Sequence, residues 1–137
     1  MTAKEFLQRF LILQRTVDGT LDKIAKAQST AQRITSFMRM TPTGGIQSLS
    51  CIENSVADIY DLTDKLADVL ALALDARTEI AEAISHVENH DERYLLELRY
   101  LCLDSWDTIA KRMNFSLQGV FKLHNRALKK FLTPQTV

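Results

Sequence analysis

The chain of 137 residues is 46% hydrophobic and 25% charged, and its 17 basic and 17 acidic side chains cancel to zero formal charge. This length suits one domain or two small ones and excludes a large multidomain enzyme, while the composition excludes an intrinsically disordered chain. Four glycines and two prolines give too few turn signals for a fold of many short strands, so the composition favours an all-α protein.

The first predicted element is a helix near residues 3–40. It opens with Thr2-Ala-Lys-Glu5, where a hydroxyl and a carboxylate three residues apart have the spacing of a capping box. Beyond this box, apolar and small residues recur in alternating steps of four and three, which is the period of a coiled-coil seam. The seam residues are Phe6, Phe10, Leu13, Val17, Thr20, Ile24, Ala27, Ala31, Ile34 and Met38.

A loop of about ten residues is expected next, because Thr41-Pro-Thr-Gly-Gly45 combines a residue that cannot continue a helix with two glycines, and serines follow. The second helix is expected near residues 50–89. One seam row repeats every seven residues, at Ile52, Ile59, Leu66, Ala73, Ile80 and Val87. The expected second row is Val56, Thr63, Leu70 and Ile84, with Arg77 as an interruption.

Two helices of similar length joined by a short connection predict a long antiparallel coiled-coil hairpin over residues 1–90. In this arrangement Leu62, Val69, Leu72 and Leu74 lie outside the seam. Two helices cannot bury this surplus of apolar side chains, and a second copy of the chain is expected to cover them. The sequence therefore predicts a homodimer.

From Asp91 onward the pattern changes to three shorter helices, near residues 94–101, 105–113 and 116–132. Asp104 or Ser105 is expected to cap the second of these helices, and Ser116 the third. Residues 91–132 thus form a predicted C-terminal three-helix domain of the helix-turn-helix type, and residues 133–137 are expected to be a frayed tail.

The helix-turn-helix prediction depends on side-chain size at fixed spacing. Ala110 is small where a second helix must cross closely, and Asn114 tolerates the left-handed conformation that a tight turn requires. The expected core residues around this turn are Ile109, Met113, Phe115, Val120 and Leu123. Trp106 is expected to pack against the same core. An ordinary three-helix packing unit is the simpler alternative.

Four segments of this region follow one another as Leu98-Arg-Tyr-Leu101, Ser105-Trp-Asp-Thr-Ile-Ala110, Met113-Asn-Phe-Ser116 and Val120-Phe-Lys-Leu-His-Asn-Arg-Ala-Leu-Lys-Lys130. In these segments the chain resembles small phage-encoded transcriptional regulators with a domain similar to sigma-factor region 4, related to the RinA and ArpU late-gene activators. The N-terminal Thr2-Ala-Lys-Glu-Phe6 and the glycine-rich loop are also similar. The resemblance implies binding to double-stranded DNA and transcriptional control in a prophage, with RNA polymerase as a further partner.

The expected DNA contacts lie mainly on the third short helix. Regulators of this family usually present basic or amide side chains where this helix begins, whereas this chain has Leu117-Gln118-Gly119. Gln118 is able to make a bidentate contact with adenine, and the base-edge candidates are Leu117, Gln118 and Phe121. The phosphate candidates are Arg112, Ser116, Lys122, His124, Arg126, Lys129 and Lys130. For His124 a structural hydrogen bond between helices is an equal alternative.

Charge is distributed unevenly along the chain, in a way that is consistent with this expectation. Residues 91–137 contain eight basic and five acidic side chains, whereas residues 1–90 contain nine basic and twelve acidic ones. Two other functions remain open at this point. A phage DNA-packaging protein similar to a terminase small subunit also joins a helix-turn-helix to an oligomerising hairpin. A protein-interaction module whose helix-turn-helix has lost DNA readout would explain Leu117 and Gly119.

No enzymatic activity, cofactor or metal is expected. The sequence has no glycine-rich phosphate loop and no nucleophile motif. His86 and His90 are spaced for one helix face but have no further convergent ligands. Cys51 and Cys102 are interpreted as packing residues in a reducing cytoplasm. The longest apolar stretch, residues 69–74, is far short of the roughly 20 residues that span a bilayer, so no membrane contact is expected.

Overall fold

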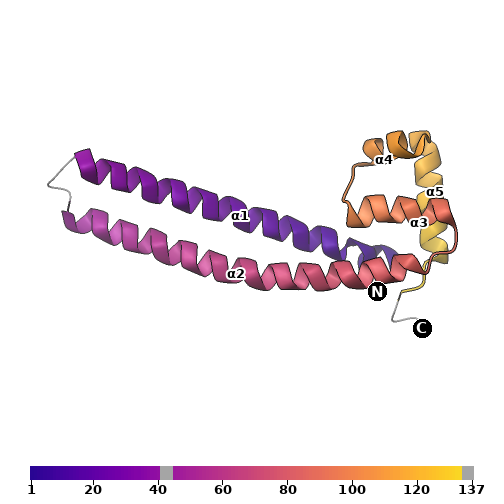
Figure 1. Cartoon of the computed structure of the whole chain (residues 1–137), viewed down its shortest axis with the longest axis horizontal. Coiled ribbons are helices and arrows are strands. Elements are labelled where there is room, and N and C mark those ends of the chain that lie inside the picture. The colour runs from indigo at the N-terminus through magenta and orange to yellow at the C-terminus, as the bar shows by residue number, and fades with distance from the viewer. Residues whose placement is uncertain (41–44, 134–137) are drawn as a thin grey trace. The chain divides into compact units, whose positions relative to one another are not determined.

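The computed structural model describes residues 1–40 and 45–133, and for residues 45–49 it describes the backbone alone. These residues form helices and short connections, with no strand among them (Figure 1). The elements in chain order are α1 (Ala3–Met40), α2 (Gly45–Ser85), α3 (His90–Leu96), the π-helical segment η1 (Glu97–Leu101), α4 (Trp106–Met113) and α5 (Leu117–Lys130). The predicted all-α class is confirmed.

The predicted start of the first helix is confirmed by its capping box. The backbone N–H of Glu5 donates to Thr2 Oγ1 at 3.2 Å, and the backbone N–H of Thr2 donates to Glu5 Oε2 at 3.0 Å. These bonds satisfy two donors that a helix start leaves without intrahelical partners. The helix then continues to Met40, as its seam predicts.

The second helix differs from its expected bounds at both ends. It begins at Gly45 rather than near residue 50. A glycine costs only about 1 kcal/mol in a helix, which is too little to prevent a helix of 41 residues from including it. It ends at Ser85 rather than near 89, and residues 86–89 form a connection in which Asn89 caps α3. Residues 41–44 of the predicted loop lie outside the described residues.

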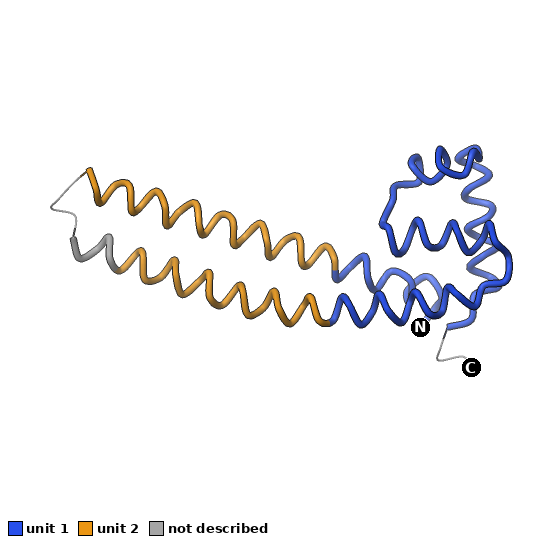
Figure 2. Tube along the Cα trace, in the orientation of Figure 1, with its two compact units in different colours: residues 1–13, 72–137 blue, residues 14–71 orange. Residues whose placement is uncertain are grey.

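The chain divides into two compact units, which Figure 2 distinguishes by colour. Unit 2, residues 14–71, contains antiparallel parts of α1 and α2 that lie side by side. The predicted seam of the first helix is confirmed here, because its residues are buried or half-buried while most of their neighbours are exposed. These residues are Val17, Thr20, Ile24, Ala27, Ala31, Ile34 and Met38.

The second seam row predicted for α2 is wrong for its first three members, whereas its fourth, Ile84, is buried. Val56, Thr63 and Leu70 are exposed, and Val56 keeps 57% of its accessible surface. The buried or half-buried row is instead Ser55, Leu62, Val69 and Ala76, each three residues after a member of the first row. Both rows satisfy a heptad period, so the period alone does not identify the buried one. Leu62 and Val69 thus belong to the seam, whereas Leu72 and Leu74 are exposed as expected.

Unit 1, residues 1–13 and 72–137, has a hydrophobic core that brings both ends of the sequence together. Phe6, Leu7 and Phe10 of α1 are buried with Ile80 and Ile84 of α2. The same core includes residues of α3 to α5, namely Leu95, Leu96, Leu98, Ile109, Val120, Leu123 and Ala127. The division by packing therefore does not follow the boundary at residue 90, because the start of α1 and the end of α2 complete the core of the short helices.

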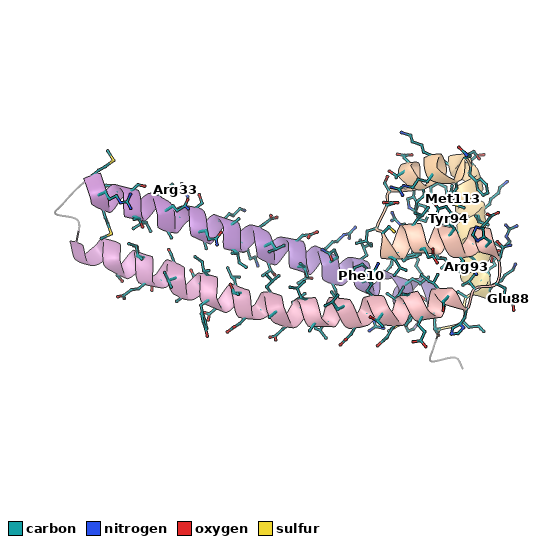
Figure 3. All side chains as sticks on the ribbon, viewed as in Figure 1. Phe10, Arg33, Glu88, Arg93, Tyr94 and Met113 are labelled. Atoms are coloured by element: carbon teal, nitrogen blue, oxygen red, sulfur yellow. The ribbon has the colours of Figure 1, made fainter. Side chains whose placement is uncertain are left out.

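Direct contacts support this grouping. The ring centroids of Phe6 and Phe131 are 6.0 Å apart, which joins the start of α1 to the residue after α5. Arg9 Nη1 lies 2.8 Å from Glu79 Oε2 and links α1 to α2 within the unit. Tyr94 of α3 and Met113 of α4 are half-buried against the core (Figure 3).

Several smaller expectations need correction. Cys51 and Cys102 are exposed thiols, so neither is a packing residue. Thr133, which was expected in a frayed tail, is buried, and residues 134–137 lie outside the described residues. Within the described part, no helix is both long enough and apolar enough to cross a membrane.

Candidate nucleic-acid interface

Helices α4 and α5 form a helix-turn-helix whose local geometry the sequence predicts well. Ser105 caps α4 by accepting from the backbone N–H of Thr108 at 3.2 Å, and Ser116 caps α5 by accepting from that of Gly119 at 3.0 Å. Between the helices, Asn114 has φ 57° and ψ 39°, the left-handed conformation expected for it. The caps and the turn fix where α5 begins.

The buried side of this motif also matches the prediction, with one exception. Ile109, Ala110, Val120 and Leu123 are buried in the core of unit 1. Phe115, which we expected in that core, keeps 38% of its surface exposed. It follows Asn114 directly, in the turn between α4 and α5.

The side of α5 that faces away from the core exposes both polar and apolar side chains to solvent. The base-edge candidates Leu117, Gln118 and Phe121 are all exposed, and Lys122 lies beside them. Asn125 is exposed on the same face, four residues after Phe121 and seven after Gln118. The sequence prediction missed Asn125, although this helical spacing was available to find it. We call Leu117, Gln118, Phe121, Lys122 and Asn125 the outer face of α5.

The segment that contains the outer face has basic side chains and no acidic ones. From Thr108 to the C-terminus the sequence contains six Lys and Arg residues and no Asp or Glu. Lys111, Lys122 and Lys129 are exposed, and none of them has a carboxylate within 4.0 Å among the described residues. These three lysines are therefore available for anionic ligands.

The other basic phosphate candidates are partly engaged inside the protein. Arg126 Nε lies 3.1 Å and Lys130 Nζ 3.4 Å from Oε1 of Glu92, whose side chain is only 1% exposed. Arg112 Nε lies 3.5 Å from Oδ2 of Asp104. The sequence prediction missed Glu92, because nothing in its local sequence indicates that it packs beneath α5.

The structure gives His124 the alternative role expected for it, a structural hydrogen bond between helices, and its buried side chain is not placed for phosphate contact. Its Nε2 lies 2.6 Å from the hydroxyl oxygen of Tyr100, a hydrogen bond that joins α5 to η1. Burial, aided by the positive charges of Lys4 and Arg99, lowers the pKa of His124 to about 4. Burial likewise raises the pKa of Tyr100 to about 12 against the opposing effect of Arg99. The pair is neutral at physiological pH and has a structural role.

Trp106 connects this buried pair to the outer face. Its ring packs edge-on against His124 at 4.8 Å and against Phe121 at 5.3 Å between centroids. The guanidinium of Arg99 lies 4.3 Å from the Trp106 centroid, and Arg99 Nη1 donates to the carbonyl of Asp104 at 3.0 Å. Trp106 is half-buried against the core, as predicted, and it restricts the position of Phe121.

Models of protein families, curated proteins and solved structures give no match to this chain. The resemblance to phage regulators therefore stays a prediction that rests on the sequence segments. The function of the helix-turn-helix is inferred from its own residues.

The expected histidine pair is not on one helix. Helix α2 ends at Ser85 and α3 begins at His90, so His86 lies in the connection between them. His90 Nδ1 instead lies 3.3 Å from Arg93 Nη2. Within the described residues, no group of three or more His, Cys, Asp or Glu side chains is placed to hold a metal ion.

The buried histidine predicts how stability depends on pH. Below its ordinary pKa of about 6.5, His124 takes up a proton in the unfolded chain but not in the folded one until about pH 4. The free energy of unfolding should therefore fall by up to about 3 kcal/mol between these pH values. Urea unfolding at several pH values tests this. We expect a shallower pH dependence for His124→Gln and an unchanged one for His86→Gln, whose imidazole is exposed.

Proposed function

We propose that this protein is a DNA-binding transcriptional regulator that places α5 in the major groove of double-stranded DNA. The observation behind the proposal is the outer face of α5, which has amide, apolar and basic side chains exposed on the second helix of a helix-turn-helix. Apart from Phe121, which packs on Trp106, none of these side chains contributes to the buried core. The prophage setting, the cytoplasmic location and the recruitment of RNA polymerase rest on the family resemblance.

In this proposal the contacts divide into two kinds. Lys111, Lys122 and Lys129 contact phosphates, together with the hydroxyl of Ser116 and the exposed part of Arg112. Gln118 and Asn125 face the base edges, since an amide side chain can donate to and accept from adenine at once. Arg126 and Lys130 contribute positive potential while they hold Glu92.

The protein is proposed to act as a homodimer. On α2, the exposed unit 2 residues Val56, Tyr60, Thr63, Ala67 and Leu70 recur in alternating steps of four and three. This is the spacing of a seam for which unit 2 supplies no second helix. A second copy would cover this seam and pair two helix-turn-helix motifs for two half-sites. Sedimentation equilibrium of the intact chain distinguishes a dimer from a monomer and from the ring of a packaging protein.

Replacing both Lys122 and Lys129 by Ala tests DNA binding. We expect weaker binding to every duplex alike, because phosphate contacts do not read sequence. The slope of log affinity against log salt concentration should become shallower by about 0.9 for each lysine that contacts a phosphate. Titration of a fluorescent duplex at several salt concentrations measures both effects.

A matched control is Lys65→Ala, which removes an exposed lysine from α2 in unit 2 and should leave affinity and slope unchanged. The proposal would be contradicted if the wild-type protein bound no duplex even at low salt. That result would favour the protein-interaction module, for which the exposed Phe115, Leu117 and Phe121 offer an apolar surface.

A further inference from the structure

We propose that α5 selects A·T base pairs, and that Leu117 and Phe121 do so by contacting the methyl groups of thymine. This inference rests on the proposed function, because it concerns how the same face would recognise DNA. Leu117 and Phe121 keep 41% and 40% of their surface exposed, although the core beside them is filled by Val120 and Leu123.

The spacing of the two side chains suits neighbouring bases. They are four positions apart in the sequence, so they lie on one side of α5 with their Cα atoms about 6 Å apart along its axis. Successive bases in one strand are about 3.4 Å apart. The two side chains can therefore reach methyl groups one or two base pairs apart in the same groove.

The charges around this apolar surface favour DNA over an apolar protein as its occupant. Lys122 lies on the same face, Lys111 lies on α4, and no acidic residue follows Asp107 in the sequence. A cationic surround complements the phosphates on either side of a groove. The 5-methyl group of thymine is the apolar group that base edges present in the major groove of unmodified DNA.

The two amide side chains of the outer face point to the same base pair. Gln118 and Asn125 have the bidentate amides that match adenine, the partner of thymine. Guanine is usually read by Arg or Lys, and the one such residue of the outer face, Lys122, is assigned to a phosphate in the proposed function. Cytosine is read by a carboxylate acceptor, and residues 108–137 contain none. The set therefore favours A·T pairs over G·C pairs.

Trp106 makes Phe121 a fixed contact rather than a mobile one. The two rings pack edge to face with centroids 5.3 Å apart, and Arg99 covers Trp106 from another side at 4.3 Å. A side chain held in place loses less conformational freedom when it binds. Trp106 and Arg99 are thus positioning residues for the methyl contact.

The experiment compares three duplexes of equal length, each long enough for two half-sites one helical turn apart. One has alternating A·T pairs, the second replaces every thymine by deoxyuridine, and the third has alternating G·C pairs. Deoxyuridine keeps base pairing and all hydrogen-bonding groups but lacks the methyl group. We expect binding to the deoxyuridine duplex to be about fourfold weaker for each methyl group that the protein contacts, and binding to the G·C duplex to be weaker still.

Variants assign the effect to the two side chains. Leu117→Ala should reduce the preference for thymine over deoxyuridine about fourfold for each half-site that is occupied. Phe121→Ala should do the same, and since Phe121 packs on Trp106, the exposed Leu117 provides the test if the Phe121 variant does not fold. Lys122→Ala should weaken binding to all three duplexes equally and leave the preference intact.

Each outcome decides between the two proposals. Equal affinity for the thymine and deoxyuridine duplexes, or tighter binding to the G·C duplex, would overturn the methyl contact and leave DNA binding standing. A preference for thymine that persists in Leu117→Ala and Phe121→Ala would overturn the assignment to these residues. Wild-type protein that binds none of the three duplexes would overturn the proposed function and this inference with it.

Discussion

Replacing Leu7 by Ala is expected to lower the free energy of unfolding of unit 1 by about 2 to 5 kcal/mol, the range usual for a buried leucine. Leu7 is fully buried, in the core that also holds Leu95, Leu96 and Ile109. The substitution leaves a cavity that rigid helices fill only in part. Urea unfolding followed by the fluorescence of Trp106, the one tryptophan of the sequence, measures the change.

The control is Leu21→Ala, which makes the same chemical change on α1 within unit 2. Leu21 keeps 47% of its surface exposed, so we expect its replacement to cost about 0.5 kcal/mol or less. If Leu7→Ala left the Trp106 transition unchanged, the start of α1 would not belong to the core of the helix-turn-helix. A chain-order domain boundary at residue 90 would then describe the folding units better.

Features set by neighbours in sequence were predictable. The capping box of Thr2 and Glu5, the Ser105 and Ser116 caps and the left-handed Asn114 each depend on residues within four positions of one another. The seam of α1 was predictable for a related reason. Its heptad pattern indicated a single pair of apolar rows as the buried face. Local chemistry and periodicity decide these features.

Features that depend on distant residues were not predictable. Helix α2 has two heptad rows that flank Ile59 and Leu66, and which of them faces α1 depends on the packing of both helices. The buried row was hard to recognise because it contains the polar Ser55 and the small Ala76. Arg77 interrupts the row that was predicted instead, and this interruption was evidence against that row. A period can identify a helix without identifying its partner.

The candidate site shows the same contrast. The exposure of Leu117, Gln118 and Phe121 follows from the period of α5 once its cap is placed. His124 lies in the same helix and has the chemistry of a phosphate ligand, but Tyr100, 24 residues away, accounts for its position. The engagement of Arg126 and Lys130 by Glu92 likewise joins residues more than 30 positions apart.

Replacing Arg126 and Lys130 together by Ala is expected to destabilise unit 1 by about 3 kcal/mol or more. Arg126 Nε lies 3.1 Å and Lys130 Nζ 3.4 Å from the same oxygen of Glu92, Oε1. The Glu92 side chain is almost wholly inaccessible to water. Without them a buried carboxylate would stay unpaired, which costs free energy. Urea unfolding at neutral pH, followed by Trp106, measures the change.

Adding Glu92→Met to the double variant should restore most of the stability, because an unbranched apolar side chain of similar size needs no cation. The pair Lys122→Ala and Lys129→Ala removes the same total charge from α5 without touching Glu92, so it should change stability by about 0.5 kcal/mol or less. A double variant as stable as the wild type would show that the carboxylate reaches water. If the prediction holds, weaker DNA binding in an Arg126 and Lys130 variant would reflect unfolding of α5 as much as the removal of phosphate ligands, which makes Lys122 and Lys129 the sharper probes of the interface.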